Sequence, residues 1–254
     1  MFLHIGAALV AFVWSLRYQS TLGIRQNEYR RYWTKAINLA LCYQGFASDT
    51  KIRSSLGAGK AAFFCCAYDV VTDWRDFNPM LFKSFESLVR HSLNTEAADL
   101  AISLYQLEKR SQLEESGLSR GFIALEFVTK IMGSEPFIRK KIDFNYFGIV
   151  MQIVDDVLDF EEDLREHKMN SLFSEKRNEY LVMLVNFSVE ETRMILPYGH
   201  VLWKVVEAAQ DRAKQMLSSS NCFLSSRPSI DINGGPNHNV NQKNGDKVPC
   251  DICK

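Results

Sequence analysis

Aspartates recur at helical spacing in the segment from Gln152 to Asp163. Asp155 and Asp159 are four residues apart, with Asp156 beside the first, so an α-helix would gather carboxylates along one side. Like charges at this spacing oppose helix formation by roughly 0.2–0.5 kcal/mol per pair. A cation would offset that cost, and Mg2+ takes carboxylate oxygens together with substrate phosphates. The segment therefore indicates a divalent-cation site, with a solvated acidic helix face as the alternative.

A second pair of carboxylates lies upstream, where Asp69 and Asp73 are again four residues apart. The apolar run Ala61–Ala67 precedes them and would hold their helix deep in a core. Helical bundles build metal sites from side chains on facing helices. Two acid-bearing helices that face each other would suit Mg2+ bridging a diphosphate, and apolar surroundings would suit a hydrocarbon chain.

The elements that must position these residues are predicted to be helices. Apolar residues recur at intervals of three and four rather than two, and alternating strand patterns are absent. We therefore expect an all-α fold. The expected helices cover residues 3–17, 26–46, 55–76, 79–92, 95–113, 118–133, 137–162, 174–195 and 199–218.

The composition changes after Ser218. Residues 219–254 are rich in Ser, Asn, Gly and Pro, and such a segment cannot bury enough apolar surface to offset its ordering entropy. We predict one helical domain over residues 1–218 and a disordered polar tail without a catalytic role over 219–254.

The overall charge and the cysteine content limit the partners and the cellular compartment that we expect. Lys+Arg and Asp+Glu both number 30, so no net field favours nucleic acid, and we expect no nucleic-acid partner. The six cysteines are scattered, which indicates a reducing compartment, and we expect a cytoplasmic protein. The apolar run Met1–Leu16 is shorter than the roughly 20 residues that span a bilayer. It predicts a buried first helix, with peripheral membrane association as the alternative.

Longer stretches around the second acidic segment resemble a known family. Phe147–Asp163 closely resembles the second aspartate-rich motif of trans-prenyl diphosphate synthases, which reads F-Q-I-x-D-D-x-L-D. Ser119–Phe127 is similar to the helix that carries a Lys-Thr pair in that family, with Arg120 where the diphosphate-binding lysine would stand. Lys168 lies near the position of the lysine that follows the second motif.

Asp69-x-x-x-Asp73 is similar to the first aspartate-rich motif, with the spacing found in squalene and phytoene synthases. Taken together, the chain resembles a divergent and shortened member of the class I isoprenoid synthase superfamily, which includes polyprenyl diphosphate synthases and terpene synthases. The resemblance implies the terpenoid synthase fold, an all-α bundle around one deep active site.

The resemblance also implies a reaction and its residues. Mg2+ would bind an allylic prenyl diphosphate, whose ionisation leaves an allylic cation in an apolar pocket; the enzyme would be a transferase or a lyase. The implied catalytic residues are Asp69, Asp73, Asp155 and Asp159; the implied metal ligands are these four and Asp156; the implied diphosphate-binding residues are Arg120, Lys168, Arg75 and Gln152.

Departures from the family pattern keep alternatives open. The first motif lacks its tandem Asp-Asp and Arg-Arg, and no G-G-K-x-x-R-P segment occurs upstream, which favours a terpene cyclase or an atypical polyprenyl diphosphate synthase over ordinary chain elongation. The Asn/Ser/Glu motif of cyclases is absent as well. A catalytically inactive regulatory subunit of a heteromeric prenyl synthase and a membrane-associated helical protein without catalysis are the alternatives. The substrate chain length is open, as is assembly into a homodimer or heterodimer.

Overall fold

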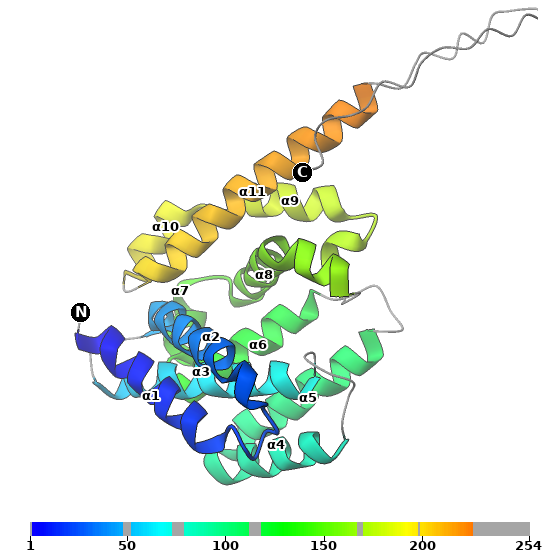
Figure 1. Ribbon diagram of the computed structural model, residues 1–254. Coiled ribbons are helices and arrows are strands. Elements are labelled where there is room, and N and C mark those ends of the chain that lie inside the picture. Colours follow the sequence, from blue (N-terminus) through cyan, green and yellow to red (C-terminus); the bar gives the residue numbers. More distant parts are fainter. Residues whose placement is uncertain are drawn as a thin grey trace, which may run out of the picture.

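All regular elements of the computed structural model are helical in the residues it describes, which are 2–47, 52–72, 79–111, 118–166, 170–197 and 199–225 (Figure 1). No strand occurs in these ranges, so the predicted all-α class is confirmed for them. The α-helices are α1 (Phe2–Tyr18), α2 (Tyr29–Tyr43), α3 (Ile52–Thr72), α4 (Pro79–Ser92), α5 (Thr95–Ser111), α6 (Ser119–Met132), α7 (Glu135–Lys141), α8 (Phe144–Glu166), α9 (Arg177–Val185), α10 (Val189–Ile195) and α11 (His200–Ser225). Short 3-10 helices are η1 (Gln26–Glu28), η2 (Gln44–Phe46) and η3 (Ser171–Phe173).

Capping side chains divide two of the predicted helices. The expected helix at 137–162 is split into α7 and α8, because the Asp143 carboxylate accepts hydrogen bonds from the backbone N–H groups of Asn145 and Tyr146, both at 3.1 Å. The expected helix at 174–195 is split into α9 and α10, where the Ser188 hydroxyl accepts from the N–H of Glu191 at 3.3 Å. Each split therefore follows from a cap that satisfies free N–H groups at the start of a new helix.

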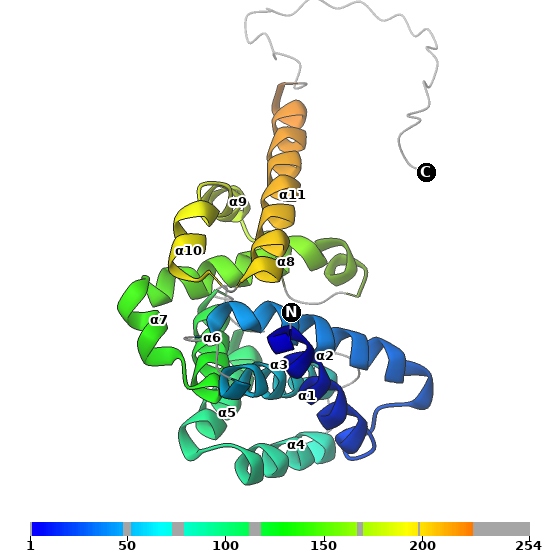
Figure 2. The same ribbon diagram turned by 90° about the vertical axis from the view of Figure 1, so that its left-hand side faces the viewer.

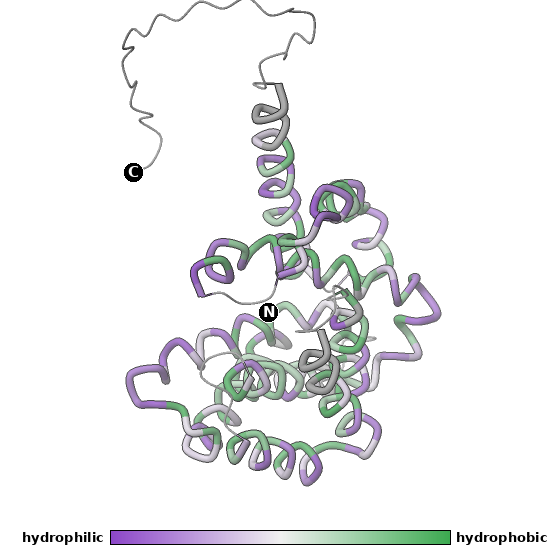
Figure 3. Tube along the Cα trace, turned by 90° about the vertical axis from the view of Figure 1, so that its right-hand side faces the viewer, coloured by the Kyte–Doolittle hydropathy of each residue, from purple (hydrophilic) through white to green (hydrophobic). Residues whose placement is uncertain are grey.

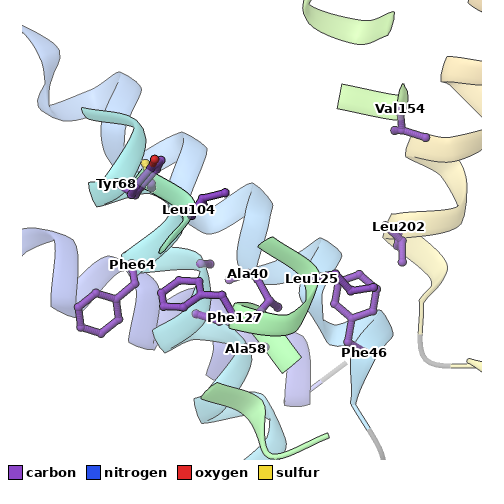
Figure 4. Close-up of a cluster of buried hydrophobic side chains, with 14 of the residues drawn as sticks. Ala40, Phe46, Ala58, Phe64, Tyr68, Leu104, Leu125, Phe127, Val154 and Leu202 are labelled. Carbon is purple, nitrogen blue, oxygen red and sulfur yellow. The ribbon is translucent and has the colours of Figure 1, made fainter. Parts of the chain in front are cut away.

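Helix α3 lies at the centre of the first part of the molecule and packs against α1, α2 and α6. Its apolar run is buried throughout except for Cys65, which is half-buried. Figure 4 shows Phe64 and Tyr68 of α3 among side chains from neighbouring helices, including Ala40 of α2 and Phe127 of α6. The prediction that this run holds the helix deep in a core is confirmed.

The remaining helices form a second group. In both Figure 1 and Figure 2, α8, α9, α10 and α11 lie on one side of α1–α6, and part of α11 projects beyond its neighbours. Hydrophobic residues lie on one side of α4 and hydrophilic residues on the other, as the helix at the bottom of Figure 3 shows, so that Phe82, Phe85, Leu88 and Val89 are buried.

Two glycines allow α6 and α8 to cross closely and so join the two groups. A Cβ added at Gly148 of α8 would lie 2.7 Å from Phe122 Cα, and one added at Gly121 of α6 would lie 2.6 Å from Gln152 Cβ. Real Cβ atoms do not tolerate such distances, so only glycine fits at this crossing. The crossing sets the position of the acidic segment of α8 relative to the rest of the chain.

The first helix is only partly buried, which corrects the prediction of a buried first helix. Its inner side consists of the small residues Ala7, Ala11 and Ser15, all fully buried. Its outer side carries large apolar residues that are 47–58% exposed: Ile5, Leu9, Val13 and Leu16. No helix in the described part of the chain combines the length and the hydropathy that crossing a membrane would require.

The last helix runs further than predicted. α11 continues to Ser225, past the expected boundary at 218. The hydroxyls of Ser218 and Ser219 donate to the backbone carbonyl of Gln215, so these serines bond back to their own helix. Residues 226–254, the rest of the predicted tail, lie outside the described residues.

Candidate functional site

An ion pair between α2 and α3 marks the first side of the site. Lys35 Nζ lies 2.7 Å from Asp69 Oδ2, and the two side chains are 39% and 28% exposed. The negative charge of Asp69 is the largest cause of a raised pKa at Lys35, so the lysine is held in its charged form. Asp155 of α8 acts on Lys35 in the same direction.

Asp155 and Asp159 of α8 form the second side. The Asp155 carboxylate is accessible to water, yet enough protein surrounds it that loss of hydration raises its pKa to about 8. Further causes of the rise are the charges of Asp159, Asp156 and Asp69, which Lys35 opposes.

The same interactions show that three carboxylates share one region. Loss of hydration is the largest cause of a raised pKa at Asp159, Lys35 lowers that pKa, and Asp69 raises it. Asp69 therefore lies within electrostatic range of both Asp155 and Asp159, although about 90 residues separate it from them in the sequence. We call Asp69, Asp155 and Asp159 the acidic cluster.

Two basic residues of α2 lie on the side that faces the acidic residues of α8. Arg31 and Lys35 stand four residues apart, and Arg31 pairs with Glu162 of α8 at 2.6 Å. The sequence interpretation missed Lys35. Its spacing from Arg31 was a visible signal, but which acidic segment it would meet depends on how α2 and α8 are placed in space.

A tyrosine and a cysteine next to the acidic cluster were also missed. Tyr43 of α2 and Cys65 of α3 share a side-chain hydrogen bond, and Asp69 raises the pKa of both groups. Burial is the largest cause for each, and it raises the pKa of Cys65 to about 12. At neutral pH both groups are protonated, so they add neutral polar atoms beside the carboxylates.

Asp156 is buried and uses both of its oxygens inside the protein. Oδ2 accepts from the backbone N–H of Ser171 at 3.1 Å and from the Ser171 hydroxyl, while Oδ1 accepts from Gln152 Nε2 at 2.9 Å. Arg120 Nη2 lies 3.8 Å from Oδ1. Burial raises the pKa of Asp156, and Ser171 and Arg120 oppose that rise. Asp156 therefore ties α8 to η3 and α6.

The structure thus divides the predicted site residues into two sets. Asp69, Asp155 and Asp159 come together around Lys35, whereas Arg120 and Gln152 contact Asp156. The predicted site residues Asp73, Arg75 and Lys168 lie outside the described residues.

Asn170, the N-cap residue of η3, was not predicted and its side chain bonds to α8. Its Nδ2 donates to the Asp156 carbonyl at 2.7 Å and to Asp163 Oδ2 at 2.9 Å, while its Oδ1 accepts from the N–H of Leu172 at 3.0 Å. One amide side chain thereby fixes the end of the acidic segment and caps η3.

The donor chemistry of the acidic cluster fits Mg2+. Carboxylate oxygens are the ligands this ion prefers. Burial is the largest cause of the raised pKa of Asp155, and the charges of Asp159, Asp156 and Asp69 add to it while Lys35 opposes it. Among the described residues, no three His, Cys, Asp or Glu side chains already lie close enough to hold one metal. Mg2+ commonly uses one or two carboxylates and completes its shell with water and phosphate.

No family model, no curated protein and no solved structure matches the chain.

Proposed function

We propose that the chain is a Mg2+-dependent enzyme that ionises an allylic prenyl diphosphate. It would be a transferase or lyase of the terpene synthase type, with the class I isoprenoid synthase arrangement of helices. The observation that carries this proposal is the convergence of Asp69 from α3 with Asp155 and Asp159 from α8. Those carboxylates come from the two segments whose sequences resemble the aspartate-rich motifs of that superfamily.

The acidic cluster would hold the cation, and bound Mg2+ would stabilise negative charge on the departing diphosphate. Because these carboxylates come from α3 and α8, the cation would bind between those two helices. Asp156 would keep α8 in place through Ser171 of η3 and Arg120 of α6, and Arg120 would also offset its buried charge. Asp156 therefore has a positioning role in this proposal, although the sequence alone made it a metal ligand. Ligand roles for Asp73, and diphosphate binding by Arg75 and Lys168, stay predictions.

Pyrophosphate release tests the proposal. Purified chain should release pyrophosphate from geranyl, farnesyl or geranylgeranyl diphosphate only when Mg2+ is present. Asp69→Asn and Asp155→Asn should each lower the rate at least about 100-fold, because each removes charge that holds the cation. Asp211→Asn, an exposed aspartate on α11, is the matched control and should keep the wild-type rate.

Two results would count against this activity. Folded wild-type protein that releases no pyrophosphate from any of the three substrates is not such an enzyme. If it nevertheless binds Mg2+ and diphosphate, the regulatory-subunit alternative takes its place. A variant that keeps both activity and helical circular dichroism removes its aspartate from the metal site.

A second role is favoured by one observation on α1. Ile5, Leu9, Val13 and Leu16 expose an apolar stripe, and the first acidic residue of the chain is Glu28. The exposed Arg17 adds positive charge at the end of this stripe, and apolar side chains beside positive charge suit the surface of an anionic membrane. We propose peripheral membrane contact through this stripe, and binding to anionic liposomes tests it.

A further inference from the structure

Lys35 places a positive charge against the acidic cluster. Its ammonium group contacts Asp69 of α3 at 2.7 Å, and Arg31, one turn earlier on α2, pairs with Glu162 of α8 at 2.6 Å, so this side of α2 meets both acid-bearing helices. We propose that Lys35 is an internal counter-cation, which offsets part of the negative charge of the acidic cluster while no metal is bound and which an incoming divalent cation displaces from Asp69. This inference rests on the proposed metal site and adds a residue that controls its loading.

Displacement follows from the distances involved. Mg2+ binds carboxylate oxygen at about 2.0–2.1 Å, so a metal on Asp69 would lie within a few ångströms of the ammonium group. Two cations at that separation repel each other strongly in partly desolvated surroundings. The lysine can leave, because its side chain is 39% exposed and its four-carbon stem is flexible.

Lys35 is not needed to hold α2 against α3. The buried residues of α2 are Tyr32, Ala36 and Ala40, and these apolar side chains form its packed side. A half-exposed ion pair adds only about 0–1 kcal/mol to stability. Replacing Lys35 should therefore leave the fold intact while it removes the charge that competes with the metal.

A purely structural ion pair and a counter-cation differ in their effect on Mg2+ affinity. If Lys35 only links α2 to α3, its removal leaves the affinity of the acidic cluster for Mg2+ unchanged or lowers it. If Lys35 competes with the metal, its removal raises that affinity. The sign of the change thus separates the two roles without any measurement of turnover.

The experiment is a calorimetric titration of the full chain with Mg2+ alone. Lys35→Met keeps the aliphatic stem and should bind Mg2+ at least about threefold more tightly than the wild type. Lys35→Arg keeps the charge and should bind like the wild type. Lys140→Met removes an exposed lysine from α7 and is the control for a change in net charge, again with wild-type affinity expected.

Thermal unfolding provides a second readout. Without metal, Lys35→Met should melt below the wild type, because the cluster loses its counter-charge; Mg2+ should then raise its Tm more than it raises that of the wild type. If the wild type binds Mg2+ and Lys35→Met binds no more tightly, the counter-cation role is wrong while the metal site stands. If neither protein binds Mg2+, both the metal site and the counter-cation role are wrong.

Discussion

Among the carboxylates that the structure describes, Asp155 has the surroundings that most clearly depart from those of an ordinary surface carboxylate. Water reaches it, yet loss of hydration and three neighbouring aspartates favour its neutral form. A protein that needs only a stable helix at this place would be better served by asparagine. The retained carboxylate is consistent with a site that trades stability for cation binding, as functional sites commonly do.

The pH dependence of stability follows from this pKa. In the unfolded chain Asp155 ionises near pH 4, whereas in the folded protein its pKa is about 8. The folded state therefore holds an extra proton between these values, and the stability that the protonated form contributes is present below pH 4 and lost as pH rises through 8. For a metal-free protein, Asp155 makes the fold less stable at pH 8 than at pH 5.

Asp155→Asn removes this penalty and should raise the Tm of the metal-free protein at pH 8. After allowance for the accessibility of the group we expect a gain of about 1 kcal/mol, or about 2–4 °C. Calorimetry in a chelating buffer at pH 5 and pH 8 measures the effect. If the difference in Tm between the wild type and Asp155→Asn is the same at pH 5 and at pH 8, Asp155 carries no such penalty.

At the scale of elements, the crossing of α6 and α8 positions much of what surrounds the site. Gly121 and Gly148 permit the close approach that sets Arg120 beside Asp156. Gly148→Ala would push its methyl group into the backbone of Phe122. We expect a loss of about 1–3 kcal/mol in the free energy of unfolding, the usual cost of overpacking, measured by denaturant titration.

Gly6→Ala is the matched control, because it also replaces a helical glycine. A Cβ at Gly6 would meet only Ser55 Cβ at 3.9 Å, an ordinary contact, so the better helix propensity of alanine should leave stability unchanged or slightly higher. Equal effects of the two substitutions would mean that the α6–α8 crossing has room to relax.

At the scale of the whole molecule, the balanced total of 30 basic and 30 acidic residues hides a local separation of charge. Acidic side chains gather on α8, while residues 1–27 contain no Asp or Glu and α1 exposes its apolar stripe. The acidic cluster and this stripe lie on different helices, and a protein that acts on an amphiphilic substrate could use both.

Flotation tests the membrane contact. Wild-type protein should rise with anionic vesicles and stay behind with zwitterionic ones. The double variant Leu9→Asp, Val13→Asp should lose binding, since it charges the exposed stripe without touching the buried side of α1. Met194→Asp, on an exposed residue of α10, should bind like the wild type. If wild-type protein never floats but forms dimers that the double variant lacks, the stripe contacts a second copy instead.

The sequence alone determined the helical class, most helix positions and the two acid-bearing segments, because these depend on local periodicity. α4 was predicted at 79–92, where the structure has it. The splits at Asp143 and Ser188 were missed, since a continuous apolar pattern concealed two capping residues.

Which carboxylates meet, and which side chains face them, depends on how the helices pack. Asp155 and Asp156 are neighbours in the sequence, yet Asp155 joins Asp69 near Lys35 while Asp156 is bound by Ser171 and Gln152. Adjacent residues on a helix point about 100° apart, so the placement of the surrounding helices gives each a different environment. Lys35 was missed for the same reason. Its partner Asp69 lies on another helix, and no local sequence pattern identifies such a partner.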